Sequence, residues 1–590
     1  MKQFQISFKD DEAFCRELAE IKQWCQINPA YTTIFRIYSE DMDYDHIRHI
    51  CDILDDKMPD ALYLGCTANA NLLDGVLAKA EIIITCTIFE YETTQAKILQ
   101  FPFLEENVKE DVDKLKACCE ENPWVNSVEM HATIMDMSMK EFCDEMSTLR
   151  KDIQVFGGGA FNPNMDDETA AVFSKGNGFL EHGIVFLLLG GDDLHTYSTF
   201  ISGWKPLKRR FRVTKADREV LYELDGKPAF DVYQRFLNIN KNENFFSNTL
   251  EFPLFIEHGD IDILRCPLAV NDDDSLVMSS DIQEDAIVRL SYGDPETILS
   301  SIRHDGQEIA NFQPEVIETF SCAARRAFWG DENISDETVP FRSVAPTAGF
   351  YTHGEFIRMG GDMLNFNVTL VIAAMREGEP KNDEVVSIYD AQRENIDKIP
   401  IIRRFVSFIE ASTAELEEIN MKLAMTSITD GLTRLYNRAE IERRIRSALE
   451  KRTKKGTTND ISLIMLDIDN FKKVNDIYGH KEGDHVIQGL SDVLRNTTTG
   501  VHSSYLGRWG GEEFMVLLSE STADEAAELA EKIRAEFASK SYETAGCQTV
   551  SIGVTQAIAD EDADTLYNRV DKALYTAKAN GKNQVVKFDK

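Results

Sequence analysis

The sequence predicts a multidomain protein of the α/β (α+β) class, and three observations support this prediction. The chain has 590 residues, which is too long for one hydrophobic core, because single domains usually hold about 150 residues. Helical patterns alternate with short apolar runs over residues 1 to about 230, as expected where helices are layered on a sheet. Near the other end, residues 505–518 contain two apolar runs separated by a glycine pair, which predicts a β-hairpin.

Composition narrows the class of protein. Charged residues make up 28% and hydrophobic residues 43% of the chain, the balance of a folded protein rather than a disordered one. The formal net charge of -38 repels phosphate backbones and anionic lipid, so we expect no nucleic-acid partner and no membrane binding. Apolar runs such as residues 82–89 and 184–189 are too short to span a bilayer, and residues 1–25 contain no signal-type apolar region. We therefore expect a cytoplasmic protein.

The cysteines give no metal site. The chain has 11 of them, scattered without a repeating C-x-x-C spacing, and the adjacent Cys118 and Cys119 are a poor framework for zinc. In a chain without an export signal we expect reduced thiols rather than disulfides.

The first part of the chain contains a helix and four strands in the predicted pattern. The helix covers residues 11–24, and the strands cover residues 32–38, 61–65, 81–89 and 183–190. A glycine triplet at 157–159 follows another apolar run. It lacks the Lys-Ser/Thr of a phosphate-binding loop and the spacing of a dinucleotide fingerprint, so we interpret it as a tight turn.

Several segments of residues 25–375 carry a family resemblance. They are Phe156-Gly157-Gly158-Gly159-Ala160-Phe161, 202–206, 223–229, 321–327, 349–356 and 365–370. Together they are similar to the FIST sensory module, which implies an N-terminal FIST domain at residues 25–228 and a C-terminal FIST domain at residues 229–378. The resemblance implies an input domain that binds a small molecule.

The identity of that small molecule is open at this point. The FIST resemblance suggests amino acids, and some members of the wider family bind haem. The histidines that would serve as a haem ligand are His182, His195, His304 and His353. For each of them a surface or core histidine is the better interpretation, so haem is not expected. Arg325 and Glu355 would suit a zwitterion, although such charges more often form an ordinary ion pair.

A helical linker is predicted at residues 389–428, after an acidic segment at 378–384. Apolar residues recur every seven positions, and intervening positions form a weaker, partly polar second layer. The two layers are Ile402, Ile409, Leu416 and Leu423, and Phe405, Ser412, Ile419 and Thr426. This heptad pattern predicts a two-stranded coiled coil. A single amphipathic helix packed on its own chain is the alternative.

The last part of the chain, residues 427–590, carries six ordered motifs. They are residues 430–438, 463–476, 479–484, 508–514, 551–554 and 573–578. In this order they resemble the GGDEF domain of diguanylate cyclases, with the variant signature Gly510-Gly511-Glu512-Glu513-Phe514. The resemblance implies a domain at residues 429–590 with a central, mostly antiparallel sheet flanked by helices.

The resemblance also implies a metal site. Asp467, the carbonyl of Ile468 and Glu512 match the family positions that hold two Mg²⁺ ions, for which Mn²⁺ is an alternative. Asp467 ends an apolar strand, where ligands of open sheets usually bind. Glu512 also matches the family's general base, but a metal-bound carboxylate is a poor base, so we rank ligation above that role. We expect Asp469 to point away.

Further motif positions match substrate contacts of the family. Asn475 and Asp484 match the residues that recognise the guanine edge, and His480 matches a neighbouring contact. Lys472 and Lys578 match cations for the triphosphate. Lys582 stands where an arginine is usual, which keeps the charge but loses the bidentate fork.

These motifs imply a ligand-regulated diguanylate cyclase that joins two GTP molecules into cyclic di-GMP. Each domain holds one GTP, and each 3′-hydroxyl attacks the other nucleotide, so a homodimer is required. One alternative is a catalytically silent receptor for GTP or cyclic di-GMP, and another is an adenylate or mixed-nucleotide cyclase. The intact acids favour an enzyme, and Asn475 with Asp484 favours guanine.

Two positions depart from the family pattern. Many diguanylate cyclases carry an Arg-x-x-Asp inhibitory site, and here Val501 and Ser504 stand in place of the two charged residues. We therefore predict no feedback inhibition through that site. Arg434 occupies a position where the family usually has glycine, and the sequence offers no explanation for it.

Overall fold

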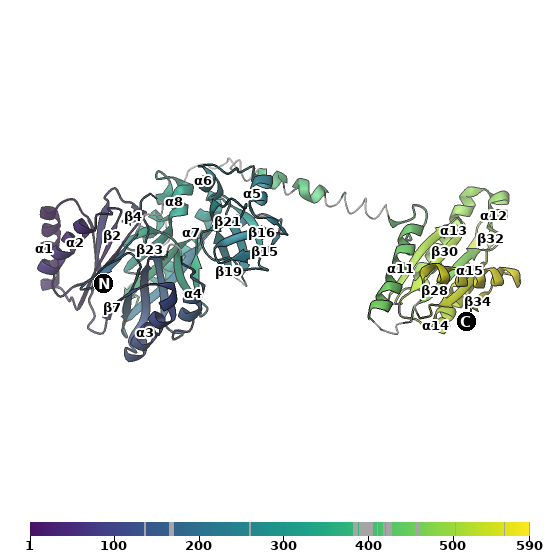
Figure 1. The fold of residues 1–590 in the computed structure, drawn as a ribbon, viewed down its shortest axis with the longest axis horizontal. Coiled ribbons are helices and arrows are strands. Elements are labelled where there is room, and N and C mark those ends of the chain that lie inside the picture. Colours follow the sequence, from purple (N-terminus) through teal and green to yellow (C-terminus); the bar gives the residue numbers. More distant parts are fainter. Residues whose placement is uncertain are drawn as a thin grey trace. The chain divides into compact units, whose positions relative to one another are not determined.

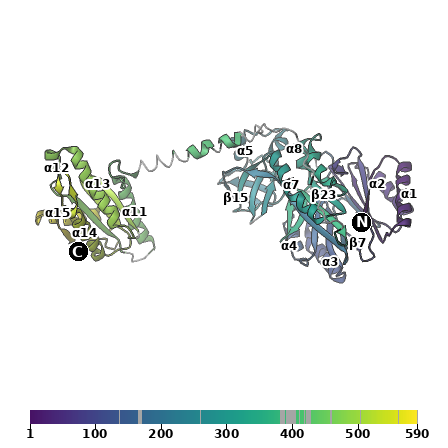
Figure 2. The same ribbon diagram turned by 180° about the vertical axis from the view of Figure 1, so that it is seen from behind.

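The computed structural model divides the chain into two compact units, Met1–Ile399 and Pro400–Lys590, drawn in Figure 1 and from behind in Figure 2. The structure describes residues 1–134, 137–164, 170–258, 261–380, 388, 405–409, 411–416, 419, 428–455, 460–501, 503–559 and 561–588. Among the helices of these residues, none combines the length and the apolar composition needed to cross a membrane.

Sheet I of the N-terminal unit has six strands in the order β1-β6-β2-β3-β10-β11. They are β1 Lys2–Ser7, β6 Ile82–Phe89, β2 Thr32–Ser39, β3 Leu62–Thr67, β10 Val172–Ser174 and β11 Gly178–Leu180. Helices α1 (Asp11–Ile27) and α2 (Tyr44–Lys57) cover one face of this sheet (Figure 1). The side chain of Asp10 caps α1 by accepting from the backbone N–H of Ala13. The predicted helix begins at the expected residue and ends at Ile27 rather than Trp24.

Sheet II has the order β26-β25-β9-β8-β12-β7. Its strands are β26 Asp362–Phe366, β25 Glu355–Met359, β9 Gln154–Gly159, β8 Val125–Ala132, β12 Gly183–Gly190 and β7 Gln95–Pro102. Its helical elements are η1 Glu105–Asn107, α3 Val108–Glu121 and α4 Lys140–Met146. Strand β12 coincides with the predicted strand at 183–190, because a continuous apolar run suits a strand that is buried on both faces.

Sheet III has the order β13-β27-β23-β24-β4-β5. Its strands are β13 Leu194–Ile201, β27 Leu370–Glu377, β23 Val316–Cys322, β24 Thr347–Thr352, β4 Ala70–Leu73 and β5 Val76–Leu77. Its helical elements are α7 Pro295–Phe312, α8 Ala323–Trp329, η2 Ile334–Glu337 and α9 Val339–Arg342. One buried core joins the three sheets, since it contains Ile34 of β2, Val185 of β12 and Phe320 of β23.

The three sheets repeat one topology. In each, the first strand of the repeat pairs antiparallel with the last, the last pairs antiparallel with the second, and the second pairs parallel with the third. A hairpin from another repeat then adds to the third strand. The exchange is cyclic: β4–β5 completes sheet III, β10–β11 completes sheet I, and β25–β26 completes sheet II. The repeats therefore interlock.

A fourth sheet is inserted between β13 and α7. Its strands are β14 Trp204–Pro206, β15 Phe211–Asp217, β16 Val220–Leu224, β17 Lys227–Pro228, β18 Leu254–His258, β19 Ile261–Arg265, β20 Pro267–Val270, β21 Leu276–Met278 and β22 Ile287–Gly293. Helices α5 (Phe230–Leu237) and α6 (Phe245–Thr249) belong to the same insert. The sequence boundary proposed at 228/229 lies at the end of β17, and strands from both sides of it share sheets II and III. That boundary remains a prediction.

The prediction of a tight turn at the glycine triplet is wrong, because these residues form the end of strand β9. A Cβ on Gly157 would lie 1.9 Å from the carbonyl oxygen of Met130. The equivalent strands β3 and β24 carry glycine at the same place in the repeat, where a Cβ on Gly65 or Gly349 would lie 2.4 or 1.8 Å from a backbone oxygen. The triplet therefore permits close strand packing.

The second strand of each repeat contributes one residue to a buried charge cluster, formed by Arg36, Glu129 and Glu318. All three side chains are fully buried, and Arg36 lies 2.7 Å from Glu129 and 3.6 Å from Glu318. Burial raises the pKa of Glu318 to about 8, against the attraction of Arg36. Burial alone would also raise the pKa of Glu129, but Arg36 and His131 hold it down, to about 2. We call these three residues the buried charge cluster.

The predicted coiled-coil linker is described only in part. Residues 405–409 and 411–416 are helical, and the side chains of Phe405, Ile409 and Leu416 are 60%, 58% and 60% exposed. The predicted seam residues Ile402, Leu423 and Thr426 lie outside the described residues.

The C-terminal unit contains a five-stranded sheet in the order β29-β30-β28-β33-β34. Its strands are β28 Ser462–Ile468, β29 Ser504–Gly510, β30 Glu513–Leu518, β33 Val550–Gln556 and β34 Val585–Phe588. A separate pair is β31 Ser541–Tyr542 with β32 Gly546–Cys547. Every neighbouring pair in the larger sheet is antiparallel except β33–β34. The predicted, mostly antiparallel sheet is confirmed.

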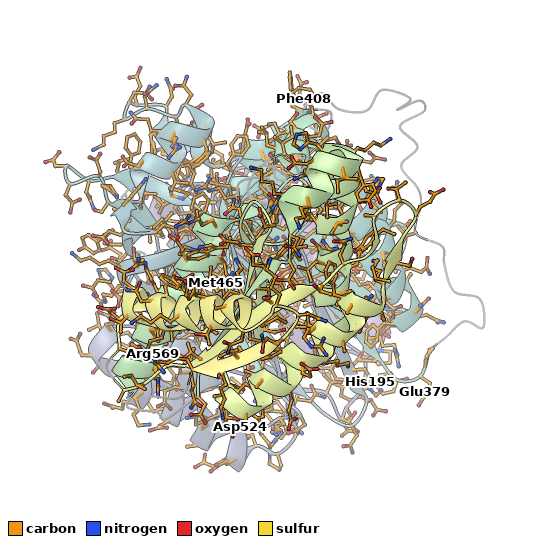
Figure 3. All side chains as sticks on the ribbon, turned by 90° about the vertical axis from the view of Figure 1, so that its right-hand side faces the viewer. His195, Glu379, Phe408, Met465, Asp524 and Arg569 are labelled. Atoms are coloured by element: carbon orange, nitrogen blue, oxygen red, sulfur yellow. The ribbon has the colours of Figure 1, made fainter. Side chains whose placement is uncertain are left out.

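Helices cover both faces of this sheet. They are α11 Arg438–Lys455, α12 Phe471–Tyr478, α13 His480–Thr497, α14 Ala523–Ser539 and α15 Ala563–Ala579. Ile464 and Leu466 of β28 pack in one core with α12, α13 and α14, whereas Leu463 and Met465 pack in another with α11 and α15. Figure 3 shows α15, which carries Arg569, crossing the region of Met465. Asp467 continues the second face and so lies on the α15 side.

Candidate active site

The hairpin tip between β29 and β30 is open. Gly510 pairs with Glu513, which leaves Gly511 and Glu512 in the turn, and Gly511 has φ +50°, a conformation that favours glycine. A Cβ on either glycine would meet nothing within 4 Å. The predicted hairpin is confirmed, and a ligand has direct access to its backbone.

The side chain of Arg508 holds the hairpin tip in place. Its guanidinium donates to the carbonyl oxygen of Gly511 from Nε at 2.9 Å and from Nη2 at 2.7 Å. Its Nη1 lies 3.2 Å from both carboxylate oxygens of Asp430, which also accepts from the backbone N–H and the hydroxyl of Thr433. The segment at 430–433 and the hairpin tip are thereby joined. This role of Arg508 was not predicted, and its one sign in the sequence is an arginine as the first residue of the 508–514 motif.

Asp467, Glu512 and Glu513 form what we call the acid cluster. Asp467 and Glu513 are directly opposite each other on β28 and β30, a pairing in which like charges repel. Burial raises the pKa of Asp467, and the carboxylates of Glu512 and Asp469 add to the effect, against a 2.7 Å ion pair with Lys578. Burial also raises the pKa of Glu513, with Asp467 contributing next. Lys578 thus pairs with Asp467, while Glu512 and Glu513 lie near that carboxylate.

The donors of this cluster suit a hard divalent cation. Carboxylate and carbonyl oxygens are the ligands that Mg²⁺ prefers, and the backbone N–H of Ile468 donates to the carbonyl of Glu512 at 3.4 Å, which places the two residues together. A bound cation would offset the burial of these carboxylates and the repulsion between them, which together raise the pKa values of Asp467 and Glu513. Within the described part of the chain, no three acidic, histidine or cysteine side chains already converge as a metal cage. The oxygen atoms of these residues are ligands of the kind that Mg²⁺ binds. In this structure the Asp467 carboxylate is paired with Lys578.

Asp469 has a structural role. It is 3% exposed and accepts from the hydroxyls of Thr549 at 2.7 Å and Ser551 at 2.6 Å, and from the backbone N–H of Asn583 at 3.0 Å. These bonds hold the segment after α15 against the sheet. Ser551 lies directly opposite Asp467 on β33, so the expectation that Asp469 points away from Asp467 is not supported.

Two helices bring the proposed guanine contacts together. Asn475 lies near the end of α12, and its Oδ1 would be 2.0 Å from a Cβ on Gly483 in the first turn of α13. Only glycine leaves room for that amide. Asp484 is the next residue and His480 begins the same helix, and both are exposed.

The three proposed phosphate cations differ in their surroundings. Lys578 of α15 is paired with Asp467. Lys582 has φ +66° and donates to Oδ1 of Asn470 at 2.6 Å, whereas Lys472 is exposed in the first turn of α12.

The two departures from the family pattern have structural counterparts. Val501 is 36% exposed, and the hydroxyl of Ser504 donates to its carbonyl at 3.0 Å. Arg434 has φ +59°, the left-handed conformation in which a Cβ is strained. That conformation explains why glycine is the usual residue there.

One of the four histidines considered for haem lines a cavity of the N-terminal unit. His353 does so, while His182 and His304 are exposed and His195, labelled in Figure 3, lies on β13. Arg325 lies 2.6 Å from Glu337, and Glu355 accepts from the hydroxyls of Thr352 and Thr369. Arg325 and Glu355 therefore serve structural contacts.

Comparisons with known proteins agree with the motifs. Family models match residues 34–227 as the FIST N domain, residues 229–358 as the FIST C domain, and residues 427–584 as "Diguanylate cyclase, GGDEF domain". A protein named diguanylate cyclase from Vibrio cholerae is 32% identical over 240 residues, covering 38% of this chain and 70% of that protein. Diguanylate cyclase DgcM of Escherichia coli K12 is 43% identical over 127 residues, covering 22% of this chain. The match spans only 30% of DgcM.

One solved structure is that of a similar protein. The coiled coil and GGDEF domain of DgcB from Caulobacter crescentus, solved in complex with c-di-GMP, is 28% identical and covers 32% of this chain and 100% of that one, with a TM-score of 0.30. On the strength of the Vibrio cholerae relative and the three matching domain models, this chain belongs to the diguanylate cyclase family and carries FIST N and FIST C domains ahead of its GGDEF domain.

Proposed function

We propose that this protein condenses two GTP molecules into cyclic di-GMP and two pyrophosphates. The observation that carries the proposal is the acid cluster, in which three carboxylates lie beside an open glycine turn with one ammonium group to balance them. Such a site is poised for divalent cations and for the triphosphate that accompanies them.

Asp467, the carbonyl of Ile468 and Glu512 would hold two Mg²⁺ ions, with Mn²⁺ as an alternative. When bound, these ions would neutralise the triphosphate and polarise the α-phosphate for attack by a 3′-hydroxyl. Glu512 would act chiefly as a ligand, because binding a cation lowers its basicity.

Lys578 would have a role in the site both without and with a bound cation. Without a cation its ammonium group neutralises Asp467 at 2.7 Å. When the carboxylate turns to a cation, the same ammonium group is freed for the triphosphate, together with Lys472 and Lys582. The exchange keeps a charged partner near Asp467 throughout.

Asn475 and Asp484 would recognise guanine, with His480 beside them. An amide and a carboxylate together can accept from the N–H groups of guanine and donate to its carbonyl, and the close approach of Asn475 to Gly483 holds the amide beside Asp484. This pairing argues against adenine.

A homodimer would bring two such sites face to face. Each 3′-hydroxyl must reach the other nucleotide, and one domain holds one GTP. The exposed side chains of Phe405, Ile409 and Leu416 at heptad positions support a coiled-coil contact with a second copy. The FIST half would set the activity of this dimer through a small ligand.

The test is product formation by the purified full chain. With GTP and Mg²⁺ we expect cyclic di-GMP by chromatography, and loss of the product in Asp467→Ala and Glu512→Ala. Asp492→Ala, at an exposed position of α13, is the matched control and should retain activity. The proposal fails if the wild-type chain consumes no GTP, or if Asp467→Ala is as active as the control.

A further inference from the structure

A cavity of about 440 Å³ lies between the inserted fourth sheet and sheet II of the N-terminal unit. Ile256, Ile263 and Arg265 line it from the insert, and Cys143 of α4 and Met363 of β26 line it from the other side. A cavity of this size, with apolar walls and a few polar groups, is typical of small-molecule binding. A ligand here would touch both parts of the unit.

Arg265 brings to this cavity a buried positive charge that has no ion pair among the described residues. The residue is 7% exposed. Its Nε donates to the carbonyl of Asp281 at 3.2 Å, and its Nη1 donates to the carbonyl of Leu264 at 3.0 Å and to Oδ1 of Asn367 at 3.1 Å. Burial lowers the pKa of Arg265 to about 10, against the attraction of Asp281. A buried cation without an anionic partner is costly, and an anionic group in the cavity would offset that cost.

The third nitrogen of this guanidinium is open. Nη2 has no acceptor among the described residues, and it is not one of the sealed side-chain atoms that lack a partner. It therefore keeps accessible surface, and Arg265 lines the cavity. A carboxylate in the cavity could accept from Nη2 in a charge-assisted hydrogen bond.

Asp281 lies beside Arg265 but forms no ion pair with it. The backbone carbonyl of Asp281 accepts from Arg265, whereas its carboxylate Oδ2 accepts from the backbone N–H of Met139 at 3.0 Å. Two opposite charges thus line one cavity, next to each other in the fold and without a direct bond. An α-amino acid carries a carboxylate and an ammonium group on one carbon atom, so it could satisfy both residues at once.

The other charged lining residues disfavour a ligand of net negative charge. Glu257 is paired with Arg210 at 3.0 Å and with Arg289 at 3.1 Å, and Asp285 is paired with Arg212 at 2.8 Å. The remaining three are exposed, and no histidine is among the described lining residues. Acids therefore outnumber bases around the cavity, and a simple carboxylate would be repelled. The charged lining residues besides Arg265 and Asp281 are Lys140, Asp144, Glu257, Glu284 and Asp285.

We propose that this cavity binds an α-amino acid with an apolar side chain, whose carboxylate accepts from Nη2 of Arg265 and whose ammonium group donates to Asp281. Its side chain would lie against Ile256, Ile263 and Met363. A monocarboxylate held by Arg265 alone and an amine held by Asp281 alone are the two rivals.

Binding at this seam would hold the insert against sheet II. Arg325 and Glu355, the pair that the sequence suggested for a zwitterion, do not line this cavity. The inference deepens the ligand-regulated part of the proposed function and rests on it only for the effect on cyclase activity, because binding is measured without GTP. A chain that makes cyclic di-GMP but binds no amino acid overturns the cavity proposal alone. A chain that binds the amino acid but makes no product overturns the proposed enzyme alone.

The probes are leucine, 4-methylpentanoate and 3-methylbutylamine, which share one branched side chain. The second lacks the ammonium group of leucine, and the third lacks its carboxylate. A saturation-transfer NMR titration of the full chain should show leucine binding with a Kd of about 0.1–1 mM, a normal affinity for so small a ligand. Each analogue should bind at least about tenfold more weakly, because one charge of the protein then stays unpaired. Equal binding of either analogue, or no leucine signal at about 10 mM, overturns the proposal.

Variants locate the two contacts. Asp281→Asn keeps the acceptor for Met139 and should weaken leucine about tenfold without weakening 4-methylpentanoate. Arg265→Met should weaken leucine at least as much without weakening 3-methylbutylamine. Asp285→Asn is the matched control, because this acid lines the same cavity but is already paired with Arg212.

Circular dichroism checks that each variant folds. Asp281→Asn changes one atom of a half-buried side chain, so it tests the proposal even if Arg265→Met does not fold. Unchanged leucine binding in folded Asp281→Asn, or an equal loss in Asp285→Asn, overturns the proposal.

Discussion

The two units each place carboxylates on neighbouring strands, and the contrast between them separates a structural cluster from a site. In the buried charge cluster, Arg36 lies between Glu129 and Glu318, and all three side chains are sealed from solvent. In the acid cluster, Asp467 and Glu513 face each other beside an open glycine turn, and Lys578 reaches them from the surface.

The buried charge cluster and the acid cluster also differ in how well their charges balance. Burial raises the pKa of Glu318 and so favours its neutral form, while Arg36 and His131 hold the pKa of Glu129 low, so Arg36 is matched chiefly by Glu129. The acid cluster sets three carboxylates against one ammonium group, and two of its members have raised pKa values. A sealed and balanced cluster stabilises the fold, whereas an accessible and unbalanced one invites a cation.

Asp467→Asn should have the largest effect. The change keeps the shape but removes a cation ligand, and we expect cyclic di-GMP synthesis to fall by about 10²–10³-fold, as for other lost groups that stabilise charge in a transition state. The rate of product formation with Mg²⁺ measures it. Retention of more than about a tenth of the wild-type rate would count against the site.

Arg36→Met tests whether the buried charge cluster stabilises the N-terminal unit. Removing one partner leaves carboxylates buried without compensation, so the N-terminal unit should lose about 3–5 kcal/mol of unfolding free energy. Urea denaturation followed by tryptophan fluorescence measures it. Adding Glu129→Gln to the variant should recover part of the loss. A loss below about 1 kcal/mol would mean that the cluster is not the structural element described.

The pH dependence of cation binding sharpens the contrast. Raised pKa values in Asp467 and Glu513 mean that folding favours their protonated forms, so their contribution to stability is present below the ordinary carboxyl pKa and is lost as the pH rises through the raised values. Mg²⁺ should therefore raise the melting temperature of the C-terminal unit at about pH 7.5 and much less at about pH 5. An equal rise at both values would contradict this.

Gly483→Ala should weaken the binding of GTP rather than the binding of cations. A methyl group would meet Oδ1 of Asn475 at 2.0 Å and displace that amide. We expect KM for GTP to rise about tenfold, the loss of one hydrogen bond, with a smaller change in kcat. Steady-state kinetics separates the two, and Gly431→Ala, where a Cβ would meet nothing within 4 Å and φ is not left-handed, controls for glycine replacement. An unchanged KM would remove Asn475 from the proposed guanine contact.

Arg434→Gly should have the smallest effect. Glycine adopts the left-handed conformation without strain, but it also raises the conformational entropy of the unfolded chain. We therefore expect the C-terminal unit to gain about 0.5–1 kcal/mol of unfolding free energy without a change in activity. Chemical denaturation measures it. Destabilisation would show that the arginine side chain makes a contact that outweighs the strain.

Local patterns in the sequence predicted the elements that depend on local physics. The strand that carries Asp467, the hairpin tip at Gly511 and the first residue of α1 follow from apolar runs, glycine and capping. The prediction of a tight turn at the glycine triplet was wrong because glycine is required there by the carbonyl of Met130. That carbonyl lies on a neighbouring strand, so the local sequence does not reveal it. The cyclic hairpin exchange and the link from Arg508 to Asp430 were missed for the same reason.

The most direct test of the account is a count of bound Mn²⁺ by electron paramagnetic resonance, with a non-hydrolysable GTP analogue present. We predict two saturable ions per chain in the wild type, loss of both in Asp467→Asn, and no change in Glu318→Gln, which alters the buried charge cluster. If Asp467→Asn binds the same number of ions with the same affinity as the wild type, the acid cluster is not the metal site and the central claim is wrong.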